Sequence, residues 1–233
     1  MPAREEVRGI GVVQLLECEP KLGDGLSEED LAVASHALPV PMAVLKKGAW
    51  SPRSEPSEVG CLGYLVAKGL LVRRVEVARG SSVELLGSGD LLRPWQEDAS
   101  SFCAASWEVL EQSTLLALGP GFTRSLARWP AVAANLAMRG LARSRALAAD
   151  AAIASMVGIE ERLLIMLWHL AERWGEASAE GVHLSIRIPH RLLAEMVGAR
   201  RPSITSALAQ LQEAGRLDSG PDGGWILLGD PPC

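Results

Sequence analysis

Two adjacent arginines, Arg200 and Arg201, stand at the front of a predicted helix in the segment GARRPSITSALAQLQEAG, residues 198–215. The N-terminus of a helix carries partial positive charge from its unpaired amide groups, so arginines at this end are electrostatically unfavourable in a purely structural element. The same unpaired amides attract anions. The pair therefore predicts that this helix end faces a negatively charged partner.

The apolar spacing of this segment indicates which side of the helix is left for such a partner. Ile204, Ala207, Leu208 and Leu211 recur at helical spacing and predict the buried face. The residues opposite or beside that face form a short, mostly polar surface: Arg201, Pro202, Ser203, Thr205, Ser206, Ala209, Gln210 and Glu213.

No other group of residues has the spacing of a catalytic or metal site. The sequence contains no GxSxG, HExxH, P-loop or GxGxxG motif in a suitable context, so we expect no catalytic residues and no enzyme. Cys18, Cys61, Cys103 and Cys233 are scattered without a CxxC pair, which favours reduced thiols over zinc ligands or disulfides. The histidines are dispersed as well, so we expect no metal site.

Length, composition and charge limit the class of protein further. A chain of 233 residues with 48% hydrophobic residues is long enough for one or two buried cores, and we expect two domains. A net charge of −5 argues against a protein that coats nucleic acid indiscriminately, although a specific binder needs only a local basic surface. Because no apolar stretch approaches about 18 to 20 residues and no leader pattern is present, we expect a cytoplasmic protein without a membrane partner.

The residue patterns predict an α+β protein whose strands come early in the chain. LSEEDLAVASHAL, residues 26–38, has a Ser27 cap before an acidic first turn and predicts a short helix. From Pro39 to Leu118, short β-type runs such as GYLVAKGLLVRRVEV, residues 63–77, are closed by glycine, serine or proline. This part of the chain predicts a β-barrel or sandwich rather than a βαβ unit.

After Gly121 the pattern becomes helical, and residues 129–157 are mostly good helix formers, with Pro130 tolerated in the first turn. A 4-3-4-3 spacing marks a stripe of small residues with one leucine along this helix: Ala133, Ala137, Gly140, Ser144, Leu147, Ala151 and Ala154. The stripe fits a seam between two copies of the chain or packing on the chain's own sheet domain. We favour the seam, because a helix this long extends beyond the face of a small domain.

The C-terminal part has the pattern of a helix-turn-helix followed by two strands. GIEERLLIMLWHLAERWG, residues 158–175, predicts a helix, and EASAEGV, residues 176–182, predicts a polar connector. Pro189 opens the first helix of a pair, Gly198 supplies the turn, and the segment with the two arginines is the second helix. RLDSGPDGGWILL, residues 216–228, predicts two strands around a turn, which makes the motif a winged helix-turn-helix.

The order and motifs of these parts resemble the Crp/Fnr family of bacterial transcription regulators. GYLVAKGLLVRRV and ELLGSGDLL resemble the glycine-punctuated strands of that family's effector domain, and VLEQSTLLAL resembles the strand that closes it. IPHRLLAEMVGARRPSITSALAQLQEAGRL is similar over its whole length to the family's winged helix-turn-helix, so the resemblance covers about residues 38–228. It implies a cyclic-nucleotide-binding-like β-barrel, or double-stranded β-roll, with an N-terminal helix over residues 1–120, a dimerisation helix over 121–157 and a DNA-binding domain over 158–233.

The resemblance implies that the helix with the two arginines is a recognition helix in the major groove of DNA, where the arginines and the helix dipole both meet phosphates. Arg201 occupies the position of a guanine-reading arginine, whose planar fork bonds O6 and N7. Pro202 and Ser206 stand where well-known members have a glutamate and a second arginine, so the operator sequence is not carried over. The expected DNA-binding residues are Arg200, Arg201, Pro202, Ser203, Thr205, Ser206 and Gln210. For the hydroxyl-bearing residues, a merely solvated helix surface is the alternative.

The segment expected around an effector departs from the family pattern. Members that bind cyclic nucleotides carry a Phe-Gly-Glu-like segment after the Gly-Asp turn and a later Arg-Ser or Arg-Thr pair, whereas residues 89–107 contain neither. Polar groups of a bound nucleotide would be left unpaired at a cost of about 1 to 3 kcal/mol each, so we expect no cyclic nucleotide and no cofactor. The candidates for a different effector pocket are Arg93, Trp95 and Trp107. The alternatives are an ion pair of Arg93 with Glu97 or Asp98, and core positions for both tryptophans.

The resemblance implies a homodimeric transcription regulator that binds double-stranded DNA at a pseudo-palindromic operator, with RNA polymerase as a further partner. Two alternatives stay open. One is a DNA-independent interaction or ligand-sensing module on the same folds, which the net charge and the acidic wing residues Asp218 and Asp222 favour. The other is a regulator gated by a cyclic nucleotide through a rebuilt pocket.

Overall fold

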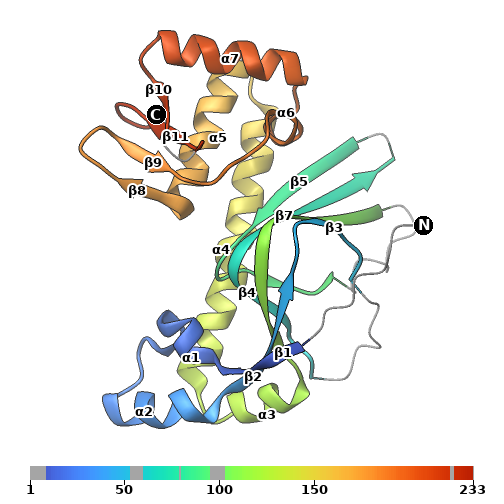
Figure 1. Ribbon diagram of the computed structural model, residues 1–233, viewed down its shortest axis with the longest axis vertical. Helices are drawn as coiled ribbons and strands as arrows, with labels where there is room; N and C mark the ends of the chain where they lie inside the picture. The colour runs from blue at the N-terminus through green and yellow to red at the C-terminus, as the bar shows by residue number, and fades with distance from the viewer. Residues whose placement is uncertain (1–8, 53–59, 79, 95–102, 221–222, 233) are drawn as a thin grey trace. The chain divides into compact units, whose positions relative to one another are not determined.

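The computed structural model describes residues 9–52, 60–78, 80–94, 103–220 and 223–232 (Figure 1). The chain divides into two compact units, Met1–Arg145 and Ala146–Cys233. Strands dominate the first unit, whereas the second combines helices with a small sheet. The expected α+β class is therefore confirmed.

The N-terminal unit is built on an antiparallel sheet. Its described strands are β1 Gly9–Gln14, β2 Pro39–Leu45, β3 Gly48–Trp50, β4 Gly63–Val77, β5 Gly80–Leu86, β6 Leu91–Leu92 and β7 Cys103–Leu118. They run in the order β1-β2-β7-β4-β5, while β3 pairs with β7 and β6 with β4. The two longest strands, β4 and β7, pair from Gly63 opposite Leu118 to Val77 opposite Cys103. The strand-rich character expected between Pro39 and Leu118 is confirmed.

Helices gather at one end of this sheet and along it (Figure 1). They are α1 Leu15–Cys18, the 3-10 turn η1 Pro20–Gly23, α2 Glu28–Ala37, α3 Pro120–Leu126 and α4 Pro130–Ser155. The expected cap of α2 is confirmed, because the Ser27 hydroxyl oxygen accepts a hydrogen bond from the Asp30 amide at 3.1 Å. The sequence analysis missed β1, α1 and α3, which are too short to show a clear period.

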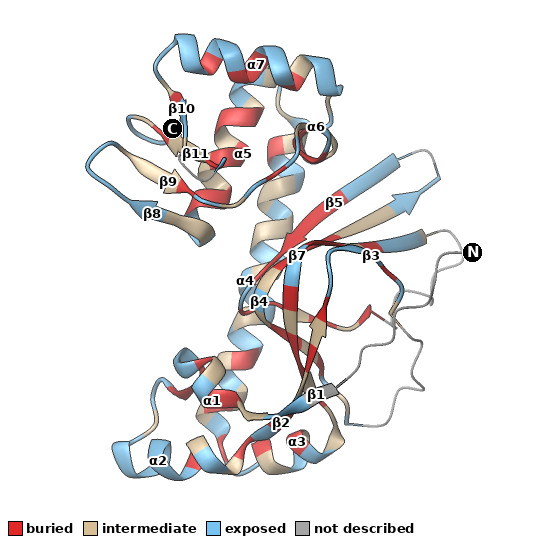
Figure 2. Cartoon of the chain, in the orientation of Figure 1, coloured by how far each residue is buried: buried red, intermediate tan, exposed pale blue. Residues whose placement is uncertain are grey.

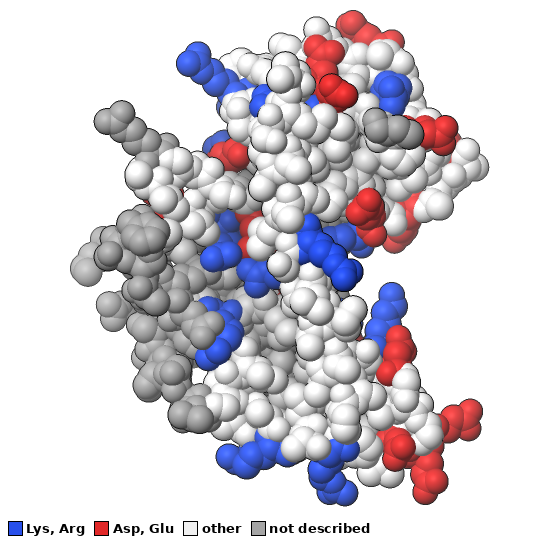
Figure 3. Space-filling view, turned by 180° about the vertical axis from the view of Figure 1, so that it is seen from behind, with Lys and Arg blue, Asp and Glu red and all other residues white. Residues whose placement is uncertain are grey.

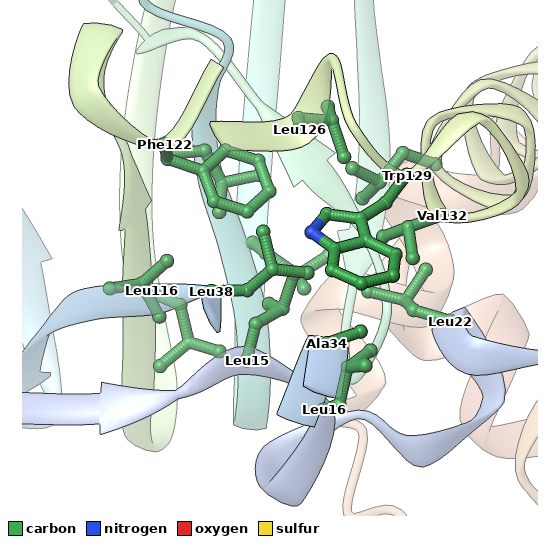
Figure 4. Close-up of a cluster of buried hydrophobic side chains, with 14 residues drawn as sticks. Leu15, Leu16, Leu22, Ala34, Leu38, Leu116, Phe122, Leu126, Trp129 and Val132 are labelled. Carbon is green, nitrogen blue, oxygen red and sulfur yellow. The ribbon is translucent and has the colours of Figure 1, made fainter. Parts of the chain in front are cut away.

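A first hydrophobic cluster joins these helices to the sheet. It contains Leu15, Leu16, Leu22, Ala34, Leu38, Val40, Leu65, Leu116, Leu118, Phe122, Leu126, Trp129, Val132 and Leu136. Figure 4 shows the Trp129 indole among Leu22, Leu126 and Val132. Each fully buried leucine contributes about 1.5 to 3 kcal/mol, so this cluster holds the first turns of α4 firmly against the sheet.

A second cluster lies among the strands themselves. It contains Leu45, Trp50, Val66, Leu71, Leu86, Leu92, Trp107, Val109 and Leu115. The rings of Trp50 and Trp107 meet edge-on, with centroids 5.6 Å apart and planes at 72°. Buried residues accordingly follow β4, β5 and β7 in Figure 2. Edge-to-face aromatic contacts add to the stability that burial alone provides.

The C-terminal unit contains the end of α4, from Ala146, and packs three further helices with a small antiparallel sheet. Its elements are α5 Ile159–Trp174, β8 Gly175–Ala177, β9 Val182–Leu184, α6 His190–Val197, α7 Arg201–Glu213, β10 Leu217–Ser219 and β11 Trp225–Leu227. The strands run in the order β10-β11-β9-β8. The expected helix pair after Pro189 and the two wing strands are confirmed.

The segment EASAEGV is not a polar connector, so this expectation is wrong. It belongs to a hairpin in which β8 and β9 pair with Gly175 opposite Leu184, and the Ser178 amide donates to the Gly181 carbonyl at 2.8 Å. β9 also pairs with the wing strand β11, where Trp225 lies opposite Leu184. Three-residue strands show too little alternation to be detected in the sequence, and their stability comes from a distant partner strand.

Two glycines with left-handed backbone give a matched test of this fold. Gly198 has a φ of 65°, and an added Cβ would meet open space, so we expect Gly198→Ala to lower the free energy of unfolding by about 1 to 2 kcal/mol. Gly69 on β4 has a φ of 97°, and an added Cβ would lie 2.6 Å from the Gln112 carbonyl oxygen. We therefore expect Gly69→Ala to cost about 3 kcal/mol or more. Urea unfolding checks both values, and equal losses would contradict the close packing at Gly69.

Candidate nucleic-acid interface

α7 buries one face in the C-terminal unit and exposes the other. Ile204 is fully buried, and Ala207, Leu208 and Leu211 are nearly so, which confirms the buried face expected from their spacing. The exposed residues of α7 are Arg201, Pro202, Thr205, Ser206, Ala209, Gln210, Gln212 and Glu213, while Ser203 is half-buried. The outer surface of α7 appears mostly pale blue in Figure 2. The polar side chains singled out in the sequence therefore share one accessible surface.

The turn between α6 and α7 fixes how α7 leaves its partner helix. Gly198 adopts the left-handed conformation that ends α6, and the Ala199 amide donates to the Ala194 carbonyl at 2.8 Å. On the α6 side, Leu192, Leu193 and Val197 are buried. A glycine turn between two helices with buried apolar faces is the geometry of a helix-turn-helix.

The front end of α7 carries positive charge and no stabilising cap. Arg200 is the N-cap residue, its side chain makes no capping hydrogen bond, and the first turn contains no acidic residue. Arg200 and Arg201 are both exposed. Pro202 lies in the first turn, where a backbone N–H would have no acceptor within the helix. Proline has no N–H, so it fits this position. Two guanidinium groups beside the unpaired first-turn amides make this end suited to an anion.

Two hydroxyl groups on the exposed side of α7 bond back to the helix. The Thr205 hydroxyl donates to the Arg201 carbonyl at 3.3 Å, and the Ser206 hydroxyl donates to the Pro202 carbonyl at 3.3 Å. The Thr205 oxygen also lies 3.1 Å from Nδ1 of His190, the first residue of α6. The sequence analysis missed His190, because residues 15 positions apart meet here only through the packing of α6 on α7.

The wing lies beside α7 and is tied to it by side chains. Gln212 donates from Nε2 to the Ser219 hydroxyl oxygen at 3.1 Å, and the Ser219 amide donates to Asp218 Oδ1 at 2.7 Å. The ring of Trp225 on β11 lies 6.3 Å from the ring of His190. Asp222 lies outside the described residues. The Asp218 carboxylate places a negative charge on the described part of the wing.

Charge on the surface is mixed rather than uniformly basic. On the face seen in Figure 3, described Lys and Arg side chains form separate groups among Asp and Glu side chains. This distribution agrees with the net charge of −5. On this face, the basic side chains are therefore grouped locally rather than spread over the whole face.

The stripe expected along α4 is exposed only in part. Ala137, Gly140, Ser144 and Ala151 are exposed, whereas Ala133, Leu147 and Ala154 are half-buried. A second series with the same spacing is exposed throughout: Ala134, Ala137, Leu141, Ser144, Ala148, Ala151 and Ser155. Leu141 and its neighbour Met138 are 53% and 51% exposed. The accessible apolar face is thus turned by about 60° from the expected stripe, because alanines occur on every side of α4 and their spacing alone does not select one register.

Of the three residues considered for an effector pocket, Arg93 and Trp107 lie within the described structure. Trp107 is 6% exposed and packs against Trp50 in the core between the strands. Arg93 is half-buried and lies beside Gly63. A Cβ added at Gly63 would lie 2.8 Å from the side chain of Arg93. Trp95, Glu97 and Asp98 lie outside the described residues. Trp107 thus has a structural position, and the pocket stays an expectation.

The cysteines have the environment of ordinary thiols. Cys18, Cys61 and Cys103 are free. Burial raises the pKa of the Cys18 thiol, and the neighbouring charges of Glu17 and Glu19 raise it further. A protonated thiol is a weak nucleophile and a weak metal ligand.

Among the described residues, no group of three or more His, Cys, Asp or Glu side chains is placed to hold a metal ion. None of the described helices is both long and apolar enough to cross a membrane.

The helix-turn-helix geometry agrees with a known domain family. Residues 161–232 match the family model of the Crp-like helix-turn-helix domain. The matched segment includes α6, α7 and both wing strands, so this part of the chain is a Crp-like helix-turn-helix domain. No curated protein matches the chain by sequence.

Several solved structures share the fold of the chain. A CooA mutant from Carboxydothermus hydrogenoformans is 18% identical, with a TM-score of 0.62 over 81% of this chain and 83% of that one. A cyclic nucleotide-binding domain containing protein from Listeria monocytogenes is 18% identical, with a TM-score of 0.63 over 80% and 88%. FixK2 from Bradyrhizobium japonicum is 16% identical, with a TM-score of 0.59 over 81% and 92%. The resemblance to the Crp/Fnr family is confirmed for residues 161–232 by the domain model and for the chain at the level of the fold by these structures.

The unfavourable charge at the front of α7 is tested by measuring the free energy of unfolding of Arg200 variants. Arg200→Asp places a capping carboxylate at the N-cap and a negative charge at the positive end of the helix dipole. We expect the free energy of unfolding of the C-terminal unit to rise by about 1 kcal/mol, and Arg200→Ala, which adds no cap, to gain less. Denaturant unfolding at low salt measures both. A loss of stability in Arg200→Asp would instead reveal a structural role for this arginine.

Proposed function

We propose that this chain, whose residues 161–232 form a Crp-like helix-turn-helix domain within the fold of the Crp/Fnr regulators, is a sequence-specific DNA-binding transcription regulator. The observation that carries the proposal is the exposed front end of α7, where Arg200 and Arg201 stand without a capping bond or an acidic first-turn residue. DNA supplies the negative charge that this helix end lacks within its own first turn.

The residues of α7 have separate roles in this proposal. Arg201, at the first helical position, bonds the O6 and N7 atoms of a guanine through its planar guanidinium group. Arg200, just before the helix, contacts a phosphate together with the first-turn amides. Pro202, Ser206 and Gln210 face the groove, with Ser203 and Thr205 at its edges.

The hydroxyl groups add a chemical constraint. Ser206 donates its hydroxyl proton to the Pro202 carbonyl, so its oxygen atom offers only acceptor lone pairs to a partner. The Thr205 hydroxyl lies within hydrogen-bond distance of both the Arg201 carbonyl and Nδ1 of His190. A phosphate oxygen is an acceptor as well. Ser206 therefore contacts a phosphate only after its hydroxyl rotates, whereas a base amino group or a water molecule is bonded without that change.

The active species in this proposal is a homodimer formed along α4. Leu141 and Met138 are large exposed apolar residues on a helix whose accessible series has the 3-4 spacing of a two-helix seam. Small residues in the same series allow the two helices to approach closely. Two recognition helices related by a two-fold axis read half-sites about 34 Å apart, which makes the operator two-fold symmetric.

DNA binding in this proposal does not require a cyclic nucleotide. The segment after the Gly89–Asp90 turn lacks the Phe-Gly-Glu-like motif and the later Arg-Ser or Arg-Thr pair that would bond a ribose hydroxyl and a cyclic phosphate. Trp107, the last residue of that segment, packs in the core. A ligand shifts an equilibrium only by its differential affinity for the two states, so a nucleotide that does not bind does not switch the protein.

The wider organisation belongs to the same proposal. Residues 1–120 form an effector-type domain, 121–157 the dimerisation helix and 158–233 the DNA-binding domain, with RNA polymerase as a further partner in the cytoplasm. The acidic net charge and Asp218 in the wing favour a second function, an interaction module that does not bind DNA. Selection from a pool of random duplexes separates the two: a regulator enriches a two-fold symmetric site, and an interaction module enriches none.

The first functional prediction separates base reading from phosphate contact. We expect Arg201→Ala to weaken binding to the selected site by about 1 to 3 kcal/mol and to relax preference at one base pair in each half-site. We expect Arg200→Ala to weaken binding evenly across sequences and to flatten the salt dependence by about one unit per contact. Binding to a library of single-base operator variants measures both. Identical base-preference profiles for the unchanged protein and Arg201→Ala would rule out the reading role.

The second functional prediction concerns the seam. Leu141→Glu places two like charges in the interface, and we expect monomers in sedimentation together with loss of binding to the two-fold operator. Val33→Glu is the matched control, because Val33 on α2 has the same exposed fraction of 53% and lies on a different element. A Leu141→Glu protein that dimerises as tightly as the control would exclude this face.

The third functional prediction concerns the effector. We expect titration calorimetry with cyclic AMP and cyclic GMP to show no saturable binding, and gel shifts at the selected operator to be the same with and without either nucleotide. Saturable binding that tightens the DNA complex would mean that the pocket is rebuilt from other residues. Arg93→Ala then tests the nearest basic side chain.

A further inference from the structure

α4 presents two arginines, Arg139 and Arg143, to carboxylates of the N-terminal unit. Arg143 donates from Nε to Glu84 Oε1 at 2.5 Å and from Nη2 to Glu84 Oε2 at 2.8 Å. Its Nη1 donates to the Leu91 carbonyl at 2.6 Å. Arg139, one helical turn earlier, donates from Nη2 to Glu19 Oε2 at 2.9 Å. α4 is therefore bonded to two other parts of this unit through directional, charged contacts.

Both carboxylates are buried. The side chains of Glu84 and Glu19 are 8% and 9% exposed. A buried carboxylate that loses all of its cationic partners is strongly destabilised, so each of these acids requires at least one paired arginine. A guanidinium group that bonds both oxygens of a carboxylate lies in a defined plane, which fixes the direction of its side chain as well as its distance.

The contacts converge from several elements. Glu84 on β5 also accepts a hydrogen bond from Arg73 on β4 at 3.2 Å. Glu19, between α1 and η1, accepts one from the Ser88 hydroxyl at 3.0 Å. Gly89 leaves the space that Arg139 occupies, because an added Cβ there would overlap the guanidinium group. The two arginines thus join α4 to the sheet, to the 87–90 turn and to the N-terminal helices.

The arginines lie on the side of α4 opposite its exposed apolar face. At about 100° per residue, Arg139 and Arg143 are each about 160° away from Leu141 around the helix. The exposed series on the Leu141 side contains Ala134, Ala137, Ser144 and Ala148. Val132 and Leu136 anchor the beginning of the helix by apolar packing, which has no directional preference. Further along α4, Arg139 and Arg143 add directional bonds on that same buried side.

We propose that Arg139 and Arg143 are positioning residues for dimerisation, which set the rotation of α4 about its axis so that the Leu141 side faces the second copy of the chain. This inference rests on the proposed homodimer. Contacts within the chain then present the seam, and no ligand is needed to turn the helix. The carboxylates of Glu19 and Glu84 are the fixed points against which the rotation is set.

Disulfide cross-linking between two copies reads the rotation directly. A disulfide forms only where Cα atoms come within about 7 Å, and neighbouring helical residues point about 100° apart. We expect Leu141→Cys to form an intermolecular disulfide at least about tenfold faster than Ala142→Cys, which is exposed on the adjoining side of α4. The protein without an added cysteine, oxidised in the same way, accounts for the native thiols.

The preference is then measured in arginine variants. We expect Arg143→Met and Arg139→Met to make the cross-linking rates of Leu141→Cys and Ala142→Cys more nearly equal. Arg143→Lys keeps the charge but loses the bidentate hydrogen bond, so we expect it to reduce the difference in rate only in part. Arg128→Met is the control, because Arg128 is exposed just before α4, and it should retain the full preference. Circular dichroism identifies the variants that fold, and Arg143→Lys decides the matter where a methionine variant does not.

The outcomes separate this inference from the proposed dimer. An undiminished preference in folded Arg143→Lys and Arg139→Met proteins overturns the positioning role while the dimer stands. Monomers in sedimentation and no cross-link in the unchanged background overturn the dimer and, with it, this inference. Loss of the preference in the arginine variants alone, with Arg128→Met unaffected, supports the positioning role.

Discussion

Two buried carboxylates, Glu19 and Glu84, constrain the N-terminal unit because each must be paired with a positive charge. A carboxylate in such a place is stable only when it is paired. Arg139 on α4 pairs with Glu19, while Arg143 on α4 and Arg73 on β4 both pair with Glu84. The 87–90 turn adds the Ser88 hydroxyl and the space at Gly89. Because these bonds are directional, one side of α4 is committed to the chain itself and the other side is left accessible.

Arginines serve opposite purposes in the two units. Arg143 is half-buried against a carboxylate that it bonds through two nitrogen atoms, so its charge is compensated within the fold. Arg200 and Arg201 are exposed at the positive end of α7, whose first turn contains no acidic residue. The same side chain stabilises the protein in the first case and opposes the helix dipole in the second. The uncompensated pair therefore marks the surface on which a partner is expected.

The wing and α6 support α7 through small polar and aromatic contacts. His190 reaches Thr205 on α7 and lies near Trp225 on β11, while Gln212 bonds Ser219 on β10. These contacts connect the recognition surface to both of its neighbours. A helix held from two sides presents its exposed residues in one defined arrangement, which specific recognition requires.

The sequence by itself determined the features that depend on neighbouring residues. These include the Ser27 cap, the turn at Gly198, the buried face of α7 with Ile204 at its centre, and the uncompensated charge at Arg201. Each follows from local spacing or backbone conformation, which short-range interactions control. Only the tertiary structure decided the β8–β9 hairpin, the core position of Trp107, the accessible side of α4 and the pairing of its arginines with Glu19 and Glu84. Those features depend on contacts between residues far apart in the chain, and where alanines surround a helix, as on α4, only such contacts select the side that is buried.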